Sequence, residues 1–308
     1  MKSKFFAVLA MVLSGLYQAS LAQQQILFTQ YMFNGLAINP AYAGSDSTLN
    51  LTVQAREQWL GFDGAPSNQI FSGHLPAGPF KQMGIGLQIE REKVAVTELL
   101  NFYASYAYKI PVGKGILAMG LQAGLTNQQQ QLTDLALPPG VTDPSFDENV
   151  STVLPNFGAG IYYQADRFYA GFSIPFLLQN SFDESDLILS ARQVRHYFLS
   201  GGYLFDLSPT LKFKPQVLVK SVPGAPVNMD LNASFLIREK VWAGVSMRNL
   251  NSFNALLELQ LNNKFKVGFA YDLITSDLGR VNSGSGEFMI NYRVFKGVPG
   301  RVISPRYF

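Results

Sequence analysis

The sequence predicts a transmembrane antiparallel β-barrel of about 14 strands, and three observations indicate it. The 308-residue chain is 47% hydrophobic and 13% aromatic, yet only 15% of its residues are charged, against roughly 25% in typical soluble domains. Beyond Ala22 no apolar run approaches the roughly 18 residues that a membrane-spanning helix needs. Apolar residues instead alternate with small or polar ones, which is the period of a strand with one apolar face.

The first 22 residues are expected to be a secretory signal peptide. Lys2 and Lys4 precede a short apolar stretch, and Ser20-Leu21-Ala22 supplies small residues at the third and first positions before a cut. We therefore assign residues 1–22 to the signal. The chain has no cysteine, which excludes disulfides, thiolate metal sites and a lipidated N-terminal cysteine. With a formal net charge of +3 and no basic runs, nucleic acid is not an expected partner.

Strand-like segments then follow one another to residue 295, so the barrel is expected to span residues 48–295. Most are about ten residues long, which suits a tilted strand crossing a bilayer, and their number is even, as in single-chain bacterial barrels. We place them at 48–57, 69–75, 83–90, 99–110, 116–125, 154–163, 168–177, 194–205, 211–220, 227–237, 241–248, 253–261, 265–274 and 286–295.

The connections between these segments predict an orientation. Those after the even-numbered segments are short, whereas those after the odd-numbered segments include 58–68, 126–153, 178–193 and 275–285. Outer-membrane barrels have short periplasmic turns and longer outside loops. Both ends of the chain are therefore expected on the periplasmic side. A soluble β-sandwich, the alternative fold, predicts no such asymmetry.

The first outer loop begins with the stretch QWLGFDGAPSNQ at residue 58. Trp59 and Phe62 are expected in the outer aromatic girdle, where amphipathic rings meet the headgroups. Asp63 belongs to the same extracellular loop. Beyond it, Ser72 and His74 share the inward face of the second strand.

The sequence offers little to a search for chemistry, and no catalytic residue, cofactor or metal site is expected. Ser72 beside His74 could indicate a membrane serine hydrolase, but polar lining of the lumen is the favoured interpretation. Asp143, Asp147 and Glu148 could bind calcium through clustered oxygens, although a solvated loop explains them more simply. Only two histidines are present, and neither has the spacing of a metal motif.

The inward faces carry charges of both signs, so the lumen is either a water-filled pore or a closed interior cross-linked by ion pairs. Pairing across neighbouring strands is the default expectation, because a selective channel would show a ring of one sign. The charged or amide residues assigned to the lumen are Gln54, Arg56, Lys212, Lys214, Asp230, Arg238, Arg248, Glu258, Lys266, Asp272, Glu287 and Arg293.

Two segments outside the strands are candidate contact sites. Residues 23–47 are too apolar for a free tail, and they are expected to be a plug or lid at the periplasmic mouth or a docking surface for a periplasmic partner. Residues 296–308 extend the chain past its last strand, with aromatics that could anchor a partner. The candidate residues are Phe28, Gln30, Tyr31, Phe33, Asn39, Pro40, Tyr42, Arg306, Tyr307 and Phe308.

Several of these stretches together resemble the PorP/SprF family of outer-membrane proteins, which is associated with type IX secretion and gliding motility. The matching pieces are Phe28-Thr29-Gln30-Tyr31-Met32, Asn39-Pro40-Ala41-Tyr42-Ala43-Gly44, Arg56, Gln58-Trp59, Gly61-Phe62-Asp63-Gly64-Ala65-Pro66, Ser72-x-His74-x-Pro76 and the ending Ser304-Pro305-Arg306-Tyr307-Phe308. The N-terminal pieces are the specific ones.

The resemblance implies a non-enzymatic accessory component of the cell outer membrane, without a cofactor. Its partners would be outer-membrane lipid, periplasmic and outer-membrane type IX components, and a secreted adhesin-type cargo protein. The alternative is a FadL-like channel for hydrophobic solutes, which the strand number and the Asn39-Pro40-Ala41 triplet suggest.

Overall fold

The computed structural model describes residues 28–46, 48–134, 147–180, 193–249, 251–275, 279 and 282–294. The proposed signal peptide and the tail from residue 296, with Arg306, Tyr307 and Phe308, lie outside these ranges. Within them, no helix has both the length and the apolar character needed to cross a membrane.

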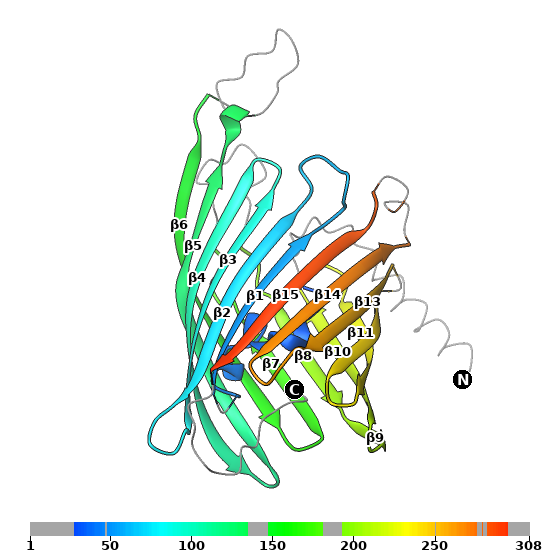
Figure 1. Cartoon of the computed structure of the whole chain (residues 1–308). Helices are drawn as coiled ribbons and strands as arrows, with labels where there is room; N and C mark the ends of the chain where they lie inside the picture. Colours follow the sequence, from blue (N-terminus) through cyan, green and yellow to red (C-terminus); the bar gives the residue numbers. More distant parts are fainter. Residues whose placement is uncertain are drawn as a thin grey trace, which may run out of the picture.

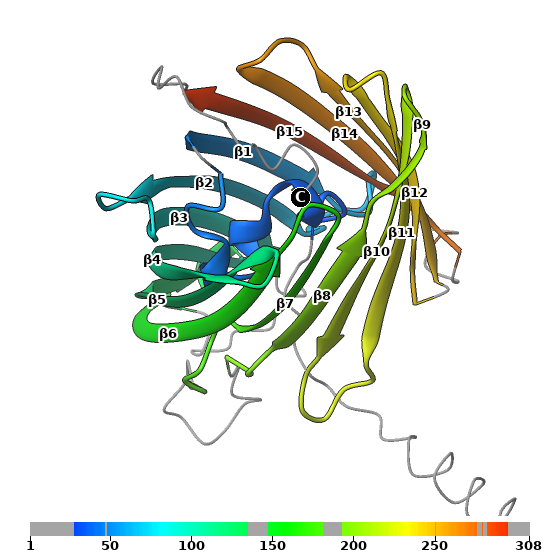
Figure 2. The same cartoon turned by 90° about the horizontal axis from the view of Figure 1, so that it is seen from below.

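The chain forms one sheet that closes on itself (Figures 1 and 2). All its pairings are antiparallel, β15 pairs with β1, and β10 pairs with β11. Its strands are β1 (Leu49–Glu57), β2 (Ser67–Ala77), β3 (Met83–Val94), β4 (Thr97–Val112), β5 (Gly115–Gln130), β6 (Val150–Gln164), β7 (Phe168–Ile174), β8 (Tyr197–Tyr203), β9 (Phe205–Ser208), β10 (Leu211–Ser221), β11 (Asn228–Ile237), β12 (Val241–Arg248), β13 (Ser252–Gln260), β14 (Phe265–Ile274) and β15 (Ser285–Val294).

β8 and β9 are two halves of one barrel strand. They are separated only by Leu204, and both pair with β10. The fold is therefore a closed barrel of 14 strands, which confirms the predicted fold class and strand number.

One strand ends earlier than predicted. The expected segment 168–177 stops as β7 at Ile174, because Pro175 has no N–H for the ladder. The Pro175 carbonyl points inward and accepts a hydrogen bond from Gln122 Nε2 at 2.9 Å. The next residue, Phe176, is buried with its ring centroid 5.5 Å from that of Tyr103. The chain thus bends into the lumen at the outer end of β7.

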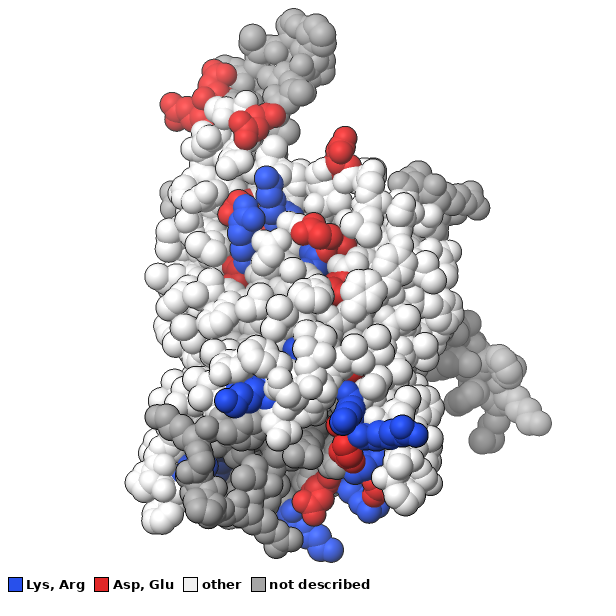
Figure 3. All heavy atoms as spheres, in the orientation of Figure 1, with Lys and Arg blue, Asp and Glu red and all other residues white. Residues whose placement is uncertain are grey.

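The alternation of side chains places apolar residues outside and polar ones inside. Leu121 is 64% exposed and Phe269 is 51% exposed, whereas their neighbours Gln122 and Ala270 are buried. Figure 3 shows charged side chains gathered toward the two ends of the barrel, with a largely uncharged band between them. An outward apolar band of this kind is the surface that a bilayer covers.

Aromatic side chains ring the outside of the barrel at the end with the short turns. The ring centroids of Tyr203 and Phe205 lie 4.6 Å apart, as do those of Phe265 and Tyr292. Further pairs at this end are Tyr163–Phe168 at 5.3 Å and Phe213–Phe235 at 5.0 Å. Such a girdle marks one membrane–water interface.

A cation in the apolar band is expected to destabilise the barrel. Replacing Leu121 with Arg should lower the free energy of unfolding in lipid vesicles by about 2–4 kcal/mol, because the guanidinium would face hydrocarbon. The matched control is Leu261→Arg, since Leu261 is 61% exposed but lies in the turn between β13 and β14. Equal losses for the two variants in urea titrations would contradict this membrane placement.

Candidate functional site

The candidate site is the stretch Phe28–Asp46, called here the inner segment, which lies inside the barrel (Figure 2). It forms three short 3-10 turns, η1 (Tyr31–Phe33), η2 (Gly35–Ala37) and η3 (Pro40–Tyr42). Most of its side chains are buried against the inward faces of the strands. We expected residues 23–47 to be a plug or lid at the periplasmic mouth or a docking surface for a periplasmic partner. The described part extends inside the lumen from Thr29, beside Asp272 and Glu287 in the long-loop half, to Gly44, beside His74 and Lys109 near the short turns. A docking role stays a prediction.

The last of these turns is defined by Asn39 and Pro40. The Asn39 side-chain oxygen accepts the Ala41 N–H at 2.9 Å, and Pro40 takes the first position of η3; both residue types favour a helix start. The Asn39 amide nitrogen donates to the carbonyl of Ile161 in β6 at 2.9 Å. Asn39 therefore shapes the segment and also fixes it to the barrel wall.

Inward-facing glycines of the barrel are in close contact with the inner segment, two of them with its backbone and two with its side chains. A Cβ atom added at any of them would overlap an atom of that segment, and glycine is the residue that permits such close approach. The pairs are Gly84 with Ala43, Gly120 with Ala41, Gly160 with Asn39 and Gly268 with Gln30. The alternation in β5 and β14 indicated Gly120 and Gly268 as inward residues, but the role that they share with Gly84 and Gly160 is visible only with the segment in place.

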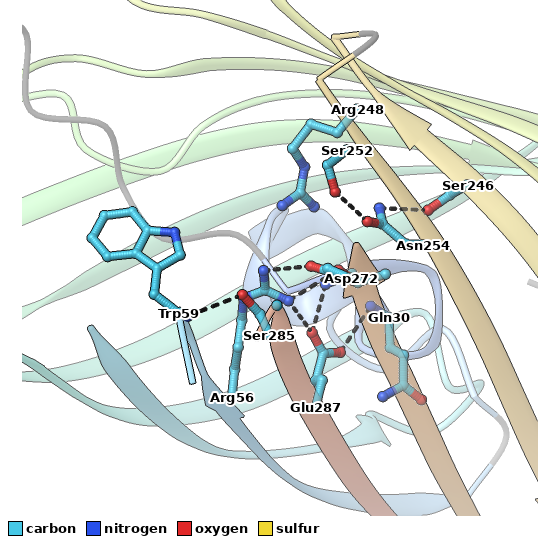
Figure 4. Close-up of polar contacts among 12 residues, drawn as sticks. Gln30, Arg56, Trp59, Ser246, Arg248, Ser252, Asn254, Asp272, Ser285 and Glu287 are labelled. Atoms are coloured by element: carbon cyan, nitrogen blue, oxygen red, sulfur yellow. Dashed lines mark hydrogen bonds and ion pairs between the residues drawn. The ribbon is translucent and has the colours of Figure 1, made fainter. Parts of the chain in front are cut away.

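A buried cluster of Arg56, Asp272 and Glu287 lies in the long-loop half of the lumen (Figure 4). An Arg56 guanidinium nitrogen is 2.5 Å from an Asp272 carboxylate oxygen, and the other is 3.2 Å from Glu287. Gln54 Nε2 also donates to Glu287 at 2.7 Å. The two acids and the arginine come from β14, β15 and β1, so the cluster joins the strands where the barrel closes.

The same cluster holds the start of the inner segment. The backbone N–H groups of Thr29 and Gln30 donate to the two oxygens of Glu287, at 2.7 and 2.8 Å. The Thr29 hydroxyl donates to Asp272 at 2.8 Å. Charge-assisted hydrogen bonds of this type are about twice as strong as neutral ones. The cluster is thus an attachment point for Thr29 and Gln30.

The other end of the inner segment is attached at β2 and β4. The Gly44 N–H donates to His74 Nδ1 at 3.2 Å, and Lys109 Nζ donates to the Gly44 carbonyl at 2.5 Å. The Ser72 hydroxyl donates to Asn34 at 2.8 Å. Ser72 and His74 therefore both bond the inner segment, an arrangement that does not support the serine hydrolase hypothesis.

Aromatic packing fills the space between these attachments. Tyr42 lies edge-on to Tyr162, with ring centroids 5.3 Å apart, and edge-on to His74 at 5.4 Å. Tyr31 and Leu36 are almost fully buried in the two apolar clusters of the lumen. Burial raises the pKa of the Tyr31 and Tyr42 phenols above the ordinary tyrosine value, so both rings stay neutral.

Other inward charges also have partners inside the barrel. Arg248 bonds Asp230 at 2.9 Å, and Lys266 bonds Glu258 at 3.1 Å. The Lys214 ammonium lies 4.2 Å from the ring centroid of Trp242, a cation–π distance. The two ion pairs confirm the expected pairing of charges across neighbouring strands, whereas Lys214 on β10 and Trp242 on β12 lie two strands apart.

Arg238 is a correction to the predicted set of inward residues. It follows the last residue of β11 and lies exposed in the turn to β12, with a left-handed φ of 48°. The alternation of faces ends with the strand, so its extrapolation to Arg238 was wrong.

The first outer loop is tied to the loop between β14 and β15. The Trp59 N–H donates to the Ser285 hydroxyl at 3.3 Å (Figure 4), and the Leu60 N–H donates to the Gly284 carbonyl at 2.8 Å. The rings of Trp59 and Phe62 meet edge to face at 6.4 Å. Phe62 and Asp63 are exposed. The place of Trp59 and Phe62 in an outer aromatic girdle stays a prediction.

The possible calcium site has no support in the described part of the chain. Asp147 and Glu148 are exposed near the start of β6, and Asp143 lies outside the described residues. Among the residues that the structure places, no group of three or more His, Asp or Glu side chains is arranged to hold a metal ion.

Solved structures with a similar fold are outer-membrane barrels. The CymD monoaromatic hydrocarbon channel has a TM-score of 0.51 at 12% identity, over 84% of this chain and 91% of that one. The Acinetobacter baumannii outer membrane protein Omp33 has a TM-score of 0.46 at 7% identity, over 82% and 100%. A Pseudomonas aeruginosa FadL homologue has a TM-score of 0.46 at 12% identity, over 83% and 92%. These likenesses concern the fold alone.

No curated protein matches the chain. The family model described as "Type IX secretion system membrane protein PorP/SprF" matches residues 20–292, which is most of the sequence. With its barrel fold, this match places the protein in the cell outer membrane. The chain belongs to the PorP/SprF family of type IX secretion system membrane proteins.

Proposed function

We propose that this protein is an accessory outer-membrane barrel of type IX secretion that supports the export or surface anchoring of cargo proteins, and that it works as a closed scaffold. The observation that carries the proposal is the fitted inner segment, with its glycine contacts and its attachment to Arg56, Asp272 and Glu287. A barrel that serves as a conduit needs a continuous path, whereas a scaffold needs a rigid wall and two accessible ends.

The interior beside the inner segment leaves little room for a solute. The cavity between that segment and β6–β8 has a volume of about 20 Å³ and is lined by Tyr31, Asn39, Tyr162 and Ser200 among others. This is room for roughly one water molecule. Pockets for small hydrophobic ligands typically measure about 300–1,000 Å³. At this depth of the lumen the dimensions favour the scaffold over the alternative, a FadL-like channel for hydrophobic solutes; a larger cavity lies nearer the short-turn end.

The two ends of the barrel then have different partners. Periplasmic components of the secretion machinery would contact the short turns and the periplasmic segments, while a cargo protein would contact the outer loops. The family membership supports a role among secretion components; the particular partners are part of the proposal.

Deleting the gene tests the proposed function. We expect at least one protein with a type IX sorting domain to accumulate in the periplasm and to return to the surface when the wild-type gene is restored. Surface display of every such protein at wild-type levels in the deletion strain would contradict the secretion role. Slower uptake of a hydrophobic solute by that strain, with secretion intact, would favour the channel instead.

A further inference from the structure

A second cavity, called here the mouth cavity, opens at the short-turn end of the barrel. Its volume is about 360 Å³, within the range of ligand pockets. Phe80, one of its lining residues, is 87% exposed, so the cavity communicates with solvent. Its lining includes Phe80, Lys81, Lys109, Ile116, Ala118 and Tyr162.

The turn between β2 and β3 holds two of these residues in fixed positions. The Phe80 N–H donates to Gln82 Oε1 at 3.0 Å, and the Lys81 N–H donates to the Gly78 carbonyl at 3.1 Å. The Gln82 carbonyl accepts the Lys109 N–H at 2.7 Å, which ties the turn to β4. Lys81 has a left-handed φ of 56°, a conformation that costs free energy and concentrates at functional sites.

The mouth cavity lies inside the barrel wall, away from the lipid. Ala118 and Tyr162 belong to the inward faces of β5 and β6, and both are buried. Ala41 and Ser45 of the inner segment line the opposite side. An occupant must therefore enter from the periplasmic side, where soluble proteins reach the barrel.

The lining selects an apolar group that carries negative charge. Phe80, Ile116 and Tyr162 provide apolar surface, and Lys81 and Lys109 are the charged residues. The Lys109 ammonium also donates to the Gly44 carbonyl of the inner segment, so it contributes its positive charge to the cavity from a fixed position. None of the described lining residues is acidic. An exposed phenylalanine beside two cations is the kind of anchor around which binding energy concentrates, and the cations favour an acidic partner. The chain's own tail carries Lys296, Arg301 and Arg306, so its side-chain charge has the same sign as the cavity's.

We propose that the mouth cavity binds an extended segment of a periplasmic protein through one aromatic or aliphatic side chain with acidic residues on both sides. This inference rests on the proposed function, because it assigns the contact with a periplasmic secretion component to a particular place. It concerns a site that the family membership alone does not locate.

A labelled peptide tests the proposal directly. The probe is fluorescein-labelled Asp-Phe-Leu-Asp-Gly amide, and its fluorescence anisotropy is followed during titration with the full-length barrel in nanodiscs. We expect saturable binding that Lys81→Glu and Ile116→Glu each weaken by about tenfold or more. The matched control is Lys264→Glu, an exposed lysine in the turn between β13 and β14 at the same end, which should leave the affinity unchanged.

Several outcomes would overturn it. Absence of saturable binding, equal binding of a peptide with Lys in place of both Asp residues, or equal weakening by Lys264→Glu would each do so. If dodecanoate displaces the labelled peptide at a lower concentration than the unlabelled peptide does, the cavity would be assigned to an acyl chain instead. A tenfold gain in peptide affinity on deletion of residues 296–308 would assign it to the tail.

A secretion assay separates this inference from the proposed function. If deleting the gene blocks display of a cargo protein but Lys81→Glu with Ile116→Glu restores full display, the cavity inference fails while the function stands. If the deletion has no effect on secretion, the function fails. Loss of display in the double variant, with normal heat-modifiable mobility of the barrel, supports the cavity.

Discussion

Replacing Arg56 with Met is expected to lower the free energy of unfolding by about 3–5 kcal/mol, because it leaves Asp272 and Glu287 as buried carboxylates without their cation. All three side chains are at most 4% exposed, so water cannot replace the guanidinium. The loss also weakens the attachment of Thr29, whose hydroxyl bonds both Arg56 and Asp272. Urea titration in lipid vesicles, followed by tryptophan fluorescence, measures the change.

Two matched variants isolate the cause of that loss. Arg91→Met removes an arginine from an ion pair on the outer face, where the Arg91 and Glu98 side chains are 45% and 24% exposed, and should cost less than about 1 kcal/mol. Adding Asp272→Asn and Glu287→Gln to Arg56→Met removes the uncompensated charges and should recover much of the stability. Equal losses for Arg56→Met and Arg91→Met would show that the buried cluster does not stabilise the barrel.

The strands could be predicted closely because lipid on one side and a polar lumen on the other impose a strict period of two. The expected range 265–274 coincides with β14, and 253–261 lies one residue from β13. The two-residue alternation carries no information about the residue at which a strand ends and the chain departs from the barrel wall. The end of β7 was missed for that reason, since the carbonyl of Pro175 bonds a side chain of β5 and Phe176 turns inward.

The sequence indicated that the inner segment is structured, but it did not indicate which barrel residues the segment contacts. Its apolar composition indicated a structured element. Its partners could not be derived, because Thr29 bonds Asp272 and Glu287 at sequence separations of 243 and 258 residues. No local pattern links residues so far apart. A partial signal was present in the glycines on inward strand positions, since a small residue facing the lumen indicates close backbone approach.

Substituting Leu for Gly120 is expected to expel the inner segment and open the barrel to ions. A Cβ atom at Gly120 would lie on the backbone of Pro40 and Ala41, and backbone atoms held by the Asn39 cap cannot move aside as a side chain can. Overpacking between side chains costs about 1–3 kcal/mol, because the side chains can shift to relieve it. An overlap with backbone atoms cannot be relieved in this way. The expected result is discrete current steps in planar bilayers, where the wild type gives none.

A matched glycine variant serves as the control, and cysteine labelling provides a second measurement. Gly201→Leu makes the same change on the outward face of β8, where an added Cβ meets its nearest atom, the Tyr169 carbonyl oxygen, at 3.5 Å, an ordinary contact. Because the chain has no cysteine, Ala43→Cys provides a single reporter at a fully buried position of the inner segment. A membrane-impermeant maleimide should label that cysteine in the Gly120→Leu background and leave it unmodified beside Gly201→Leu. Labelling of the cysteine in both backgrounds would mean that the inner segment does not close the lumen. Silent bilayers with Gly120→Leu would mean that the close contact at Gly120 is not what keeps the barrel closed.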